Sequence, residues 1–363
     1  MKLIAQVKLN PTKEQAELLK QTLLSANKAA QHISDYAWMA KVFGQYDLHH
    51  ATYHEVRSRF NLSAQMTVRA IAKVADAYKL DRKSKRTFRP LGSVAYDNRI
   101  LSWKFDNQTV NIWTVDGRQR IPFVVGDRQM RMLQHIQGEA DLVYRNEDYY
   151  LYQTCEIDEQ DPNTPEEWLG VDLGIVNLAT DSDGNVFTGE KIEATRKWYE
   201  SRRAALQSVG TKSAKRRLRQ LSGRQYRFQK DANHTIAKRI VELAKRTGRG
   251  IALEDLKGIR DRVRLRRKQR AQHSNWQFHQ LRSFLEYKAK LVGVFLQLID
   301  PRYTSQACSR CGHCEKANRP TRDNFRCVSC GYAAPADINA AANIAARAKV
   351  NWPMVPTALP SVA

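Results

Sequence analysis

The chain has 363 residues, which is enough for two or three domains with hydrophobic cores of their own. Lys and Arg number 60 against 37 Asp and Glu, so the formal net charge is +23. This balance favours a polyanionic partner over a merely well-solvated surface. No apolar run approaches the roughly 20 residues of a bilayer span, and the N-terminal residues lack the apolar block of a signal peptide. These two observations exclude an integral membrane protein and predict a soluble, intracellular one.

The first strand is predicted at residues 2–9, where apolar and polar side chains alternate. Thr12 and Gln15 have the spacing of a capping box, so a long helix begins there. Two more helices are predicted, one near residues 49–60 and one from Ser63 onward. A helical block therefore follows the first strand.

A basic connector at residues 80–90 comes next, and it is either a solvated linker or a contact for a nucleic-acid backbone. Its candidate contacts are Lys83, Lys85 and Arg86. Residues 93–157 are rich in strand patterns and contain an Asp116-Gly117 hairpin turn. Together with residues 2–9 they predict a small antiparallel β-barrel, into which the helical block is inserted.

An acidic stretch with two prolines, residues 158–167, predicts a linker and the main domain boundary. Three consecutive strands are predicted after it, at residues 169–173, 178–181 and 186–188. The pattern changes to helical after the third strand.

Residues 193–244 predict helices that break near Gly210 and again near Gly223. Their basic face is either an ordinary solvated surface or a nucleic-acid groove, and the density of positive charge favours the groove. The candidate contacts on this face are Lys212, Lys215, Arg216 and Arg219.

A short buried strand is predicted at residues 250–256, and the basic loop 257–270 supplies the candidate contacts Arg262, Arg264, Arg266 and Arg267. Further on, the pattern predicts a helix at 276–292, a strand at 294–299, a last helix at 337–349 and a disordered tail at 351–363.

Five of the six cysteines lie between Cys308 and Cys330, which is typical of a metal site and not of a disulfide framework. Two C-x2-C pairs, each followed by glycine, predict a closed tetrahedral site for one structural zinc ion. The predicted ligands are Cys308, Cys311, Cys327 and Cys330. His313 and Cys314 stay open as substitutes for one of these ligands.

Three carboxylates form a second predicted site. Asp172 and Glu254 lie in otherwise apolar strand patterns, where an unpaired charge costs several kcal/mol. Asp337 opens the last helix, where the alternative role is an N-cap. Oxygen ligands without a neighbouring His or Cys suit Mg²⁺, and two such ions about 4 Å apart promote phosphodiester hydrolysis. Acids on the first and fourth strands and on the last helix predict an RNase H-like α/β fold.

The segments GVDLGIVNLAT, EDLKGIR, YTSQACSRCG, CVSCG and DINAAANI resemble the TnpB (OrfB) proteins of bacterial insertion sequences. These are transposon-encoded, RNA-guided nucleases related to the type V CRISPR effectors. The resemblance covers residues 168–349, and residues 1–160 agree only in architecture. It implies that Asp172, Glu254 and Asp337 are RuvC-type catalytic acids that bind two Mg²⁺ ions, and that the four cysteines hold the zinc of a target-strand-loading lobe.

The resemblance also implies a guide RNA as cofactor, double- and single-stranded target DNA as partners, and a bacterial or archaeal cytoplasm as location. The oligomeric state stays open. The predicted domains are a wedge-like barrel (1–10 and 80–160), a helical recognition insertion (11–79), a RuvC-like nuclease domain (166–305 and 332–350), a zinc lobe (306–331) and the tail (351–363).

The sequence thus predicts a magnesium-dependent, RNA-guided DNA endonuclease that cuts beside a short DNA motif. Three alternatives remain: an RNA-guided regulator that binds DNA without cutting it, an unguided transposase, and a type V CRISPR effector.

Overall fold

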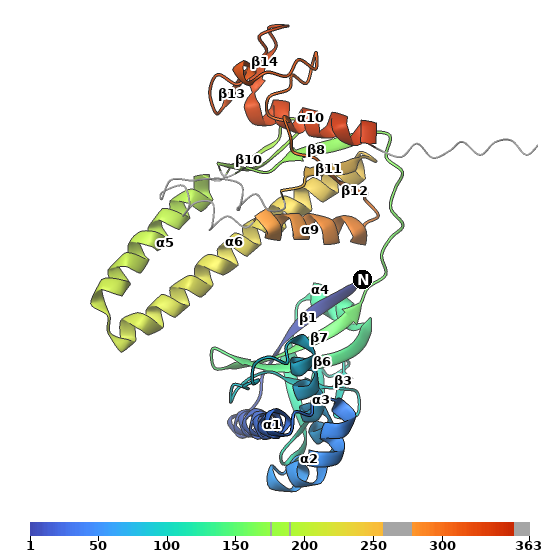
Figure 1. The fold of residues 1–363 in the computed structure, drawn as a ribbon, viewed down its shortest axis with the longest axis vertical. Coiled ribbons are helices and arrows are strands. Elements are labelled where there is room, and N and C mark those ends of the chain that lie inside the picture. The colour runs from blue at the N-terminus through green and yellow to red at the C-terminus, as the bar shows by residue number, and fades with distance from the viewer. Residues whose placement is uncertain (175, 189, 257–277, 352–363) are drawn as a thin grey trace, which may run out of the picture. The chain divides into compact units, whose positions relative to one another are not determined.

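The computed structural model describes residues 1–174, 176–188, 190–256 and 278–351. The chain divides into two compact units, Met1–Asp158 and Glu159–Ala363 (Figure 1). Within the described ranges, no helix combines the length and apolar character of a membrane span. The predicted basic loop 257–270 and the tail 352–363 lie outside the described residues.

The first unit is built on an antiparallel sheet of seven strands in the order β2-β6-β7-β1-β5-β4-β3. The strands are β1 (Lys2–Leu9), β2 (Val94–Tyr96), β3 (Leu101–Lys104), β4 (Thr109–Thr114), β5 (Gly117–Val124), β6 (Ile136–Arg145) and β7 (Asp148–Glu156). The central strand β1 pairs with β5 and β7 and buries Ala5, Val7 and Leu9. Tyr96, on one edge strand, donates its hydroxyl to the carbonyl of Trp113 near the other edge at 3.0 Å. The sheet is therefore a near-closed barrel, as the alternating pattern predicted.

Three helices lie between β1 and β2 in the chain: α1 (Lys13–Ala40), α2 (Gln45–Arg59) and α3 (Ala64–Leu80). The capping box of Thr12 and Gln15 is present with both of its hydrogen bonds, and Ser63 caps α3 through the amide of Met66. The sequence did not predict α4 (Asp127–Leu133), because seven residues are too few to show a helical period.

The second unit contains a five-stranded mixed sheet in the order β10-β9-β8-β11-β12. Its strands are β8 (Trp168–Asp172), β9 (Asn177–Asp181), β10 (Val186–Thr188), β11 (Gly250–Glu254) and β12 (Leu296–Ile299). Strands β8, β11 and β12 run parallel, whereas β9 and β10 are antiparallel to their neighbours. Leu253 pairs with Val171, so β8 and β11 end side by side.

Helices cover both faces of this sheet (Figure 1). They are α6 (Lys212–Arg246), α9 (Phe278–Leu291) and α10 (Ala336–Asn351), whereas α5 (Glu190–Val209) packs on α6. One face packs on α6 and α9 through a core that includes Val171 and Leu253. The other face packs on α10 through Trp168, Ala252 and Ile344. Alternate residues of β8 thus face opposite layers, as the period of a strand requires.

The approach of α10 to β8 depends on Gly170. A Cβ atom at this position would lie 2.0 Å from the carbonyl oxygen of Ala341 and 2.6 Å from the amide nitrogen of Ala345. Only a residue without a side chain allows this contact. Because Asp172 is two residues further along the strand, it points to the same side as Gly170, toward α10.

The predicted helix break at Gly210 is present, and Gly210 has a positive φ of 66°. The predicted break near Gly223 is wrong, because α6 runs without interruption from Lys212 to Arg246. One glycine weakens a helix interior by only about 1 kcal/mol, and burial of Leu221 and Gln225 on either side offsets this.

Candidate functional site

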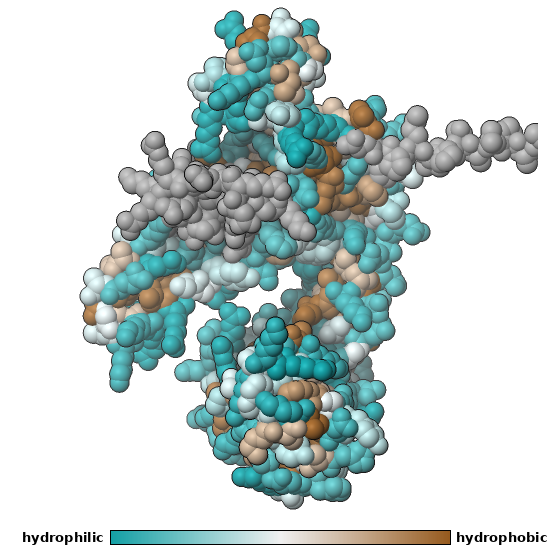
Figure 2. All heavy atoms as spheres, viewed as in Figure 1, coloured by the Kyte–Doolittle hydropathy of each residue, from teal (hydrophilic) through white to brown (hydrophobic). Residues whose placement is uncertain are grey.

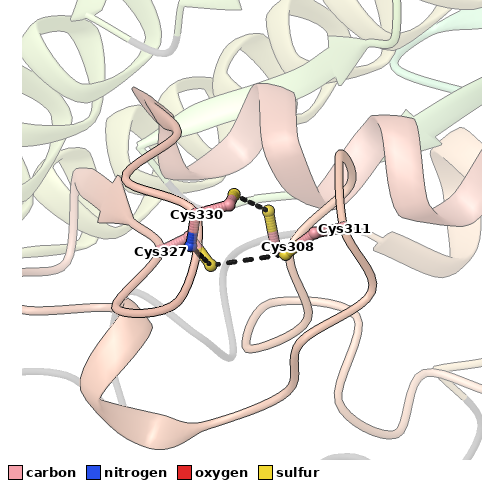
Figure 3. A group of neighbouring side chains, drawn as sticks. All are labelled: Cys308, Cys311, Cys327 and Cys330. Carbon is pink, nitrogen blue, oxygen red and sulfur yellow. Dashed lines mark hydrogen bonds between the residues drawn. The ribbon is translucent and has the colours of Figure 1, made fainter.

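Four thiolates from two turns converge on one point (Figure 3). The Sγ atoms of Cys308, Cys311, Cys327 and Cys330 all lie within 4.8 Å of one another. The sulfurs of Cys308 and Cys330 are 3.7 Å apart, and those of Cys311 and Cys327 are 3.6 Å apart. Four sulfurs about 2.3 Å from a tetrahedral zinc ion would be separated by roughly 3.8 Å. The cluster is therefore consistent with a structural zinc site.

The two C-x2-C turns have the same construction. Gly312 and Gly331 have φ values of 76° and 71°, which a side chain would strain. Their amides donate to the carbonyls of Cys308 and Cys327 at 2.9 and 3.0 Å. His313 is occupied elsewhere, since its Nε2 lies 3.2 Å from a carboxylate oxygen of Glu315. The structure groups the four predicted cysteines and leaves His313 and Cys314 out of the cluster.

Asn318 joins the two turns. Its side chain is fully buried and lies in the short 3-10 helix Lys316–Asn318. Its side-chain amide nitrogen donates to the carbonyl of His313 at 3.0 Å, and its side-chain oxygen accepts from the backbone amide of Val328 at 2.9 Å. The sequence does not indicate this role of Asn318, because no local pattern predicts a contact between loops ten residues apart.

The three predicted carboxylates come from three neighbouring elements. Asp172 ends β8, Glu254 ends the adjacent parallel strand β11, and Asp337 lies in the first turn of α10. Burial raises the pKa of Asp172 to about 7, and the negative charges of Glu254 and Asp337 contribute to this increase. Burial also raises the pKa of Glu254. The acids are therefore close enough to repel one another when ionised.

The donor set of this acid cluster fits a hard divalent cation. All three side chains supply oxygen, and a nearby cation would relieve their repulsion. Thr180, the cross-strand partner of Asp172, is buried, and its hydroxyl has no hydrogen-bond partner in the described part of the chain. In the described ranges, the four cysteines are the only group of three or more such residues whose ligand atoms all lie within 4.8 Å of one another. The carboxylate oxygens of the acid cluster are therefore spaced more widely than the thiolates.

Three residues that the sequence pattern did not indicate contact these acids. Asn177 donates its side-chain amide to Asp337 at 2.8 Å. Arg319, which belongs to the segment between the two cysteine pairs, places its guanidinium 4.0 Å from the Asp337 carboxylate. Its positive charge opposes the increase in the pKa of Asp172. Thr304 forms a hydrogen bond to the carboxylate of Glu254.

Two of the predicted nucleic-acid contacts in the first unit have protein partners. Lys85 forms an ion pair with Asp35 at 2.9 Å, and Arg86 forms one with Asp81 at 3.0 Å. Lys83 is exposed, and its backbone amide donates to Asp81 at 2.7 Å. The candidates in this connector thus have unequal freedom to meet a phosphate.

The α5–α6 hairpin presents a basic surface. Residues 201–230 contain no acid and many cations: Arg202, Arg203, Lys212, Lys215, Arg216, Arg217, Arg219, Arg224, Arg227 and Lys230. The predicted contacts Lys212, Lys215, Arg216 and Arg219 are all exposed. Hydrophilic side chains dominate the visible face of this hairpin (Figure 2). The predicted contacts Arg262, Arg264, Arg266 and Arg267 lie outside the described residues.

Two family models match adjacent parts of the chain. Residues 150–276 match OrfB_IS605, described as a probable transposase, and residues 278–344 match the Cas12f1-like TNB domain. A CRISPR-associated endodeoxyribonuclease Cas12f1 of Syntrophomonas palmitatica is 34% identical over 46% of this chain and 36% of its own length. A putative RNA-guided DNA endonuclease InsQ of Escherichia coli is 29% identical over 49% of this chain and 48% of its own length. The chain thus spans less than half the length of these relatives.

The fold is also similar to that of a solved protein. A chain of a Cas12f1–sgRNA–target DNA complex superposes with a TM-score of 0.57 at 14% sequence identity, over 92% of this chain and 83% of that one. At this identity the similarity concerns the fold alone.

Proposed function

We propose that this chain is an RNA-guided DNA endonuclease of the TnpB (OrfB) family. The matches of residues 150–276 to OrfB_IS605 and of residues 278–344 to the Cas12f1-like TNB domain support this proposal. The observation that carries the proposal is the placement of Asp172 and Glu254 at the ends of adjacent parallel strands, beside Asp337 on the helix that packs on them. The sheet order β10-β9-β8-β11-β12, with helices on both faces, supports an RNase H-like nuclease domain of the RuvC type.

In this proposal Asp172, Glu254 and Asp337 hold two Mg²⁺ ions. Bound there, the ions would supply an activated water and would stabilise the leaving oxygen of the phosphodiester. The protein's part is to hold the three carboxylates in place. Asn177 orients the carboxylate of Asp337 through a hydrogen bond, and Arg319 neutralises its charge. The carboxyl group of Asp172 has a pKa of about 7 and must lose its proton for the site to be complete.

The other surfaces fit the remaining roles. The guide RNA would supply sequence recognition by base pairing, and the exposed cations of α6 would hold phosphates with a salt-dependent affinity. We assign the first unit to the wedge and recognition parts, and residues 306–331 to the lobe that loads the target strand. The segment that carries the cysteines also supplies Arg319, which supports a place for this lobe beside the acid cluster.

Sequencing of the RNA that co-purifies with the protein is the first test. A defined RNA with a constant scaffold and a variable end supports a guide, whereas the absence of RNA favours an unguided transposase. Cleavage of a matching DNA in Mg²⁺ then separates a nuclease from an RNA-guided regulator. Asp172→Ala, Glu254→Ala and Asp337→Ala should each abolish cleavage and leave RNA binding intact. Full cleavage by any one of these variants would refute the assignment of the site.

A further inference from the structure

We infer that Thr304 is a positioning residue, which fixes the carboxylate of Glu254 and connects it to the helix that carries Asp337. This inference rests on the proposed function, because it concerns how the acid cluster is held ready for divalent cations. Thr304 is 3% exposed and lies in the segment that leads from β12 to the first cysteine pair.

The hydroxyl of Thr304 has two acceptors within reach. It bonds to Oε1 of Glu254, and the carbonyl oxygen of Pro301 lies 3.0 Å away. A hydroxyl has one proton, and an ionised carboxylate is a stronger acceptor than a peptide carbonyl. The proton is therefore directed to Glu254 when that side chain is charged. Contact with Pro301 alone would make Thr304 only a turn residue, and an experiment must separate the two roles.

The backbone of Thr304 is in turn held by α10. Asn343, which is 8% exposed, donates its side-chain amide to the carbonyls of Thr304 at 2.8 Å and Ala307 at 2.7 Å. Asn339, which is fully buried, donates to the carbonyl of Ala307 at 2.8 Å and accepts from the amide of Ser309 at 3.0 Å. Both asparagines lie on the helix that begins with Asp337 in its first turn.

These contacts form a continuous connection from one acid to another. Glu254 is bonded to Thr304, Thr304 to Asn343, and Asn343 shares a helix with Asp337. A carboxylate that loses such a partner regains rotational freedom, so the arrangement that binds a cation forms less often. Loss of an outer partner of a metal ligand typically weakens metal affinity or activity about 10- to 100-fold.

The test compares Thr304→Val, which keeps the shape and removes the hydroxyl, with Thr304→Ser, which keeps the hydroxyl. Mn²⁺ binding to the nucleic-acid-free chain is followed by the EPR signal of free Mn²⁺, and the Mg²⁺ concentration for half-maximal DNA cleavage is measured on the guide complex. Thr304→Val should raise both metal requirements about tenfold or more. Thr304→Ser should stay close to the parent chain.

Three controls make the outcome decisive. Glu254→Gln must weaken Mn²⁺ binding; if it does not, the proposed acid site fails, whatever Thr304 does. Thr304→Val in the Glu254→Gln background should add little, because the hydroxyl acts through that carboxylate. Zinc content and thermal unfolding show whether the valine variant folds, and Thr304→Ala replaces it if it does not. Unchanged metal requirements in a folded, zinc-loaded valine or alanine variant would overturn the inference.

Discussion

Removing the charge of Asp172 should stabilise the second unit in the absence of divalent cations. The pKa of this carboxyl is raised from 3.8 to about 7, first by burial and then by the charges of Glu254 and Asp337. A tenfold change in an ionisation equilibrium corresponds to about 1.4 kcal/mol, so ionised Asp172 destabilises the fold by up to about 4 kcal/mol. This is an upper limit, because the side chain retains partial contact with solvent. Asp172→Asn keeps the size of the side chain and removes this penalty.

The sign and the pH range follow from proton linkage. Between pH 3.8 and about 7 the folded chain binds more protons at this site than the unfolded chain, so stability falls as pH rises. The upper limit of the penalty is about 1 kcal/mol at pH 4.5 and rises to about 4 kcal/mol near pH 8. The advantage of Asp172→Asn should therefore be several-fold larger at pH 8 than at pH 4.5.

Hydrogen exchange of peptides that cover β8 and β11 measures this effect in the second unit alone. Buffers are freed of Mg²⁺ by dialysis and contain no chelator, because a chelator would also remove metal from the cysteines. The matched control is Asp181→Asn. Asp181 is a fully buried carboxylate of the neighbouring strand, but it accepts hydrogen bonds from the amides of Asp183 and Asn185, so its replacement should destabilise. Equal protection of Asp172→Asn and the parent chain at pH 8, or lower protection of the variant, would refute the reasoning.

Three further predictions concern other parts of the molecule. Cys308→Ser or Cys327→Ser should lose one equivalent of zinc by elemental analysis, whereas Cys314→Ser should retain it, and the reverse pattern would contradict the ligand set. Gly170→Ala should lower the unfolding midpoint of the second unit, because its Cβ would overlap the backbone of α10 and overpacking costs about 1–3 kcal/mol. Gly223→Ala is the control and should not lower this midpoint, since its Cβ would meet only the flexible end of an arginine side chain at 3.4 Å. Changing four exposed cations of α6 to glutamine should reduce the salt dependence of nucleic-acid binding by a logarithmic slope of about 3, while Lys238→Gln, whose cation is paired with Glu242 at 3.6 Å, should leave the slope nearly unchanged. The four cations are Lys212, Lys215, Arg216 and Arg219.

Local sequence patterns predicted the elements whose conformation depends mainly on residues close by in the chain. The alternation in residues 2–9 and the capping box at Thr12 depend on neighbours in sequence, and both agree with the structure. The break predicted near Gly223 is absent, because packing along α6, and not the conformational preference of glycine, decides the conformation there. The catalytic role of Asp172, Glu254 and Asp337, the finer domain boundaries and the nucleic-acid contacts stay predictions.

Local sequence patterns do not predict contacts between residues far apart in the chain. Such contacts connect the acid cluster with the cysteine cluster. Thr304 reaches Glu254 across fifty residues of chain, and Asn343 reaches Ala307 across thirty-six. The same segment continues into Cys308, and the loop between the cysteine pairs returns Arg319 to Asp337. A zinc ion that holds this lobe together would therefore also hold Thr304 and Arg319 in place. Loss of the thiolate site should then loosen the acid cluster, although no thiolate belongs to it.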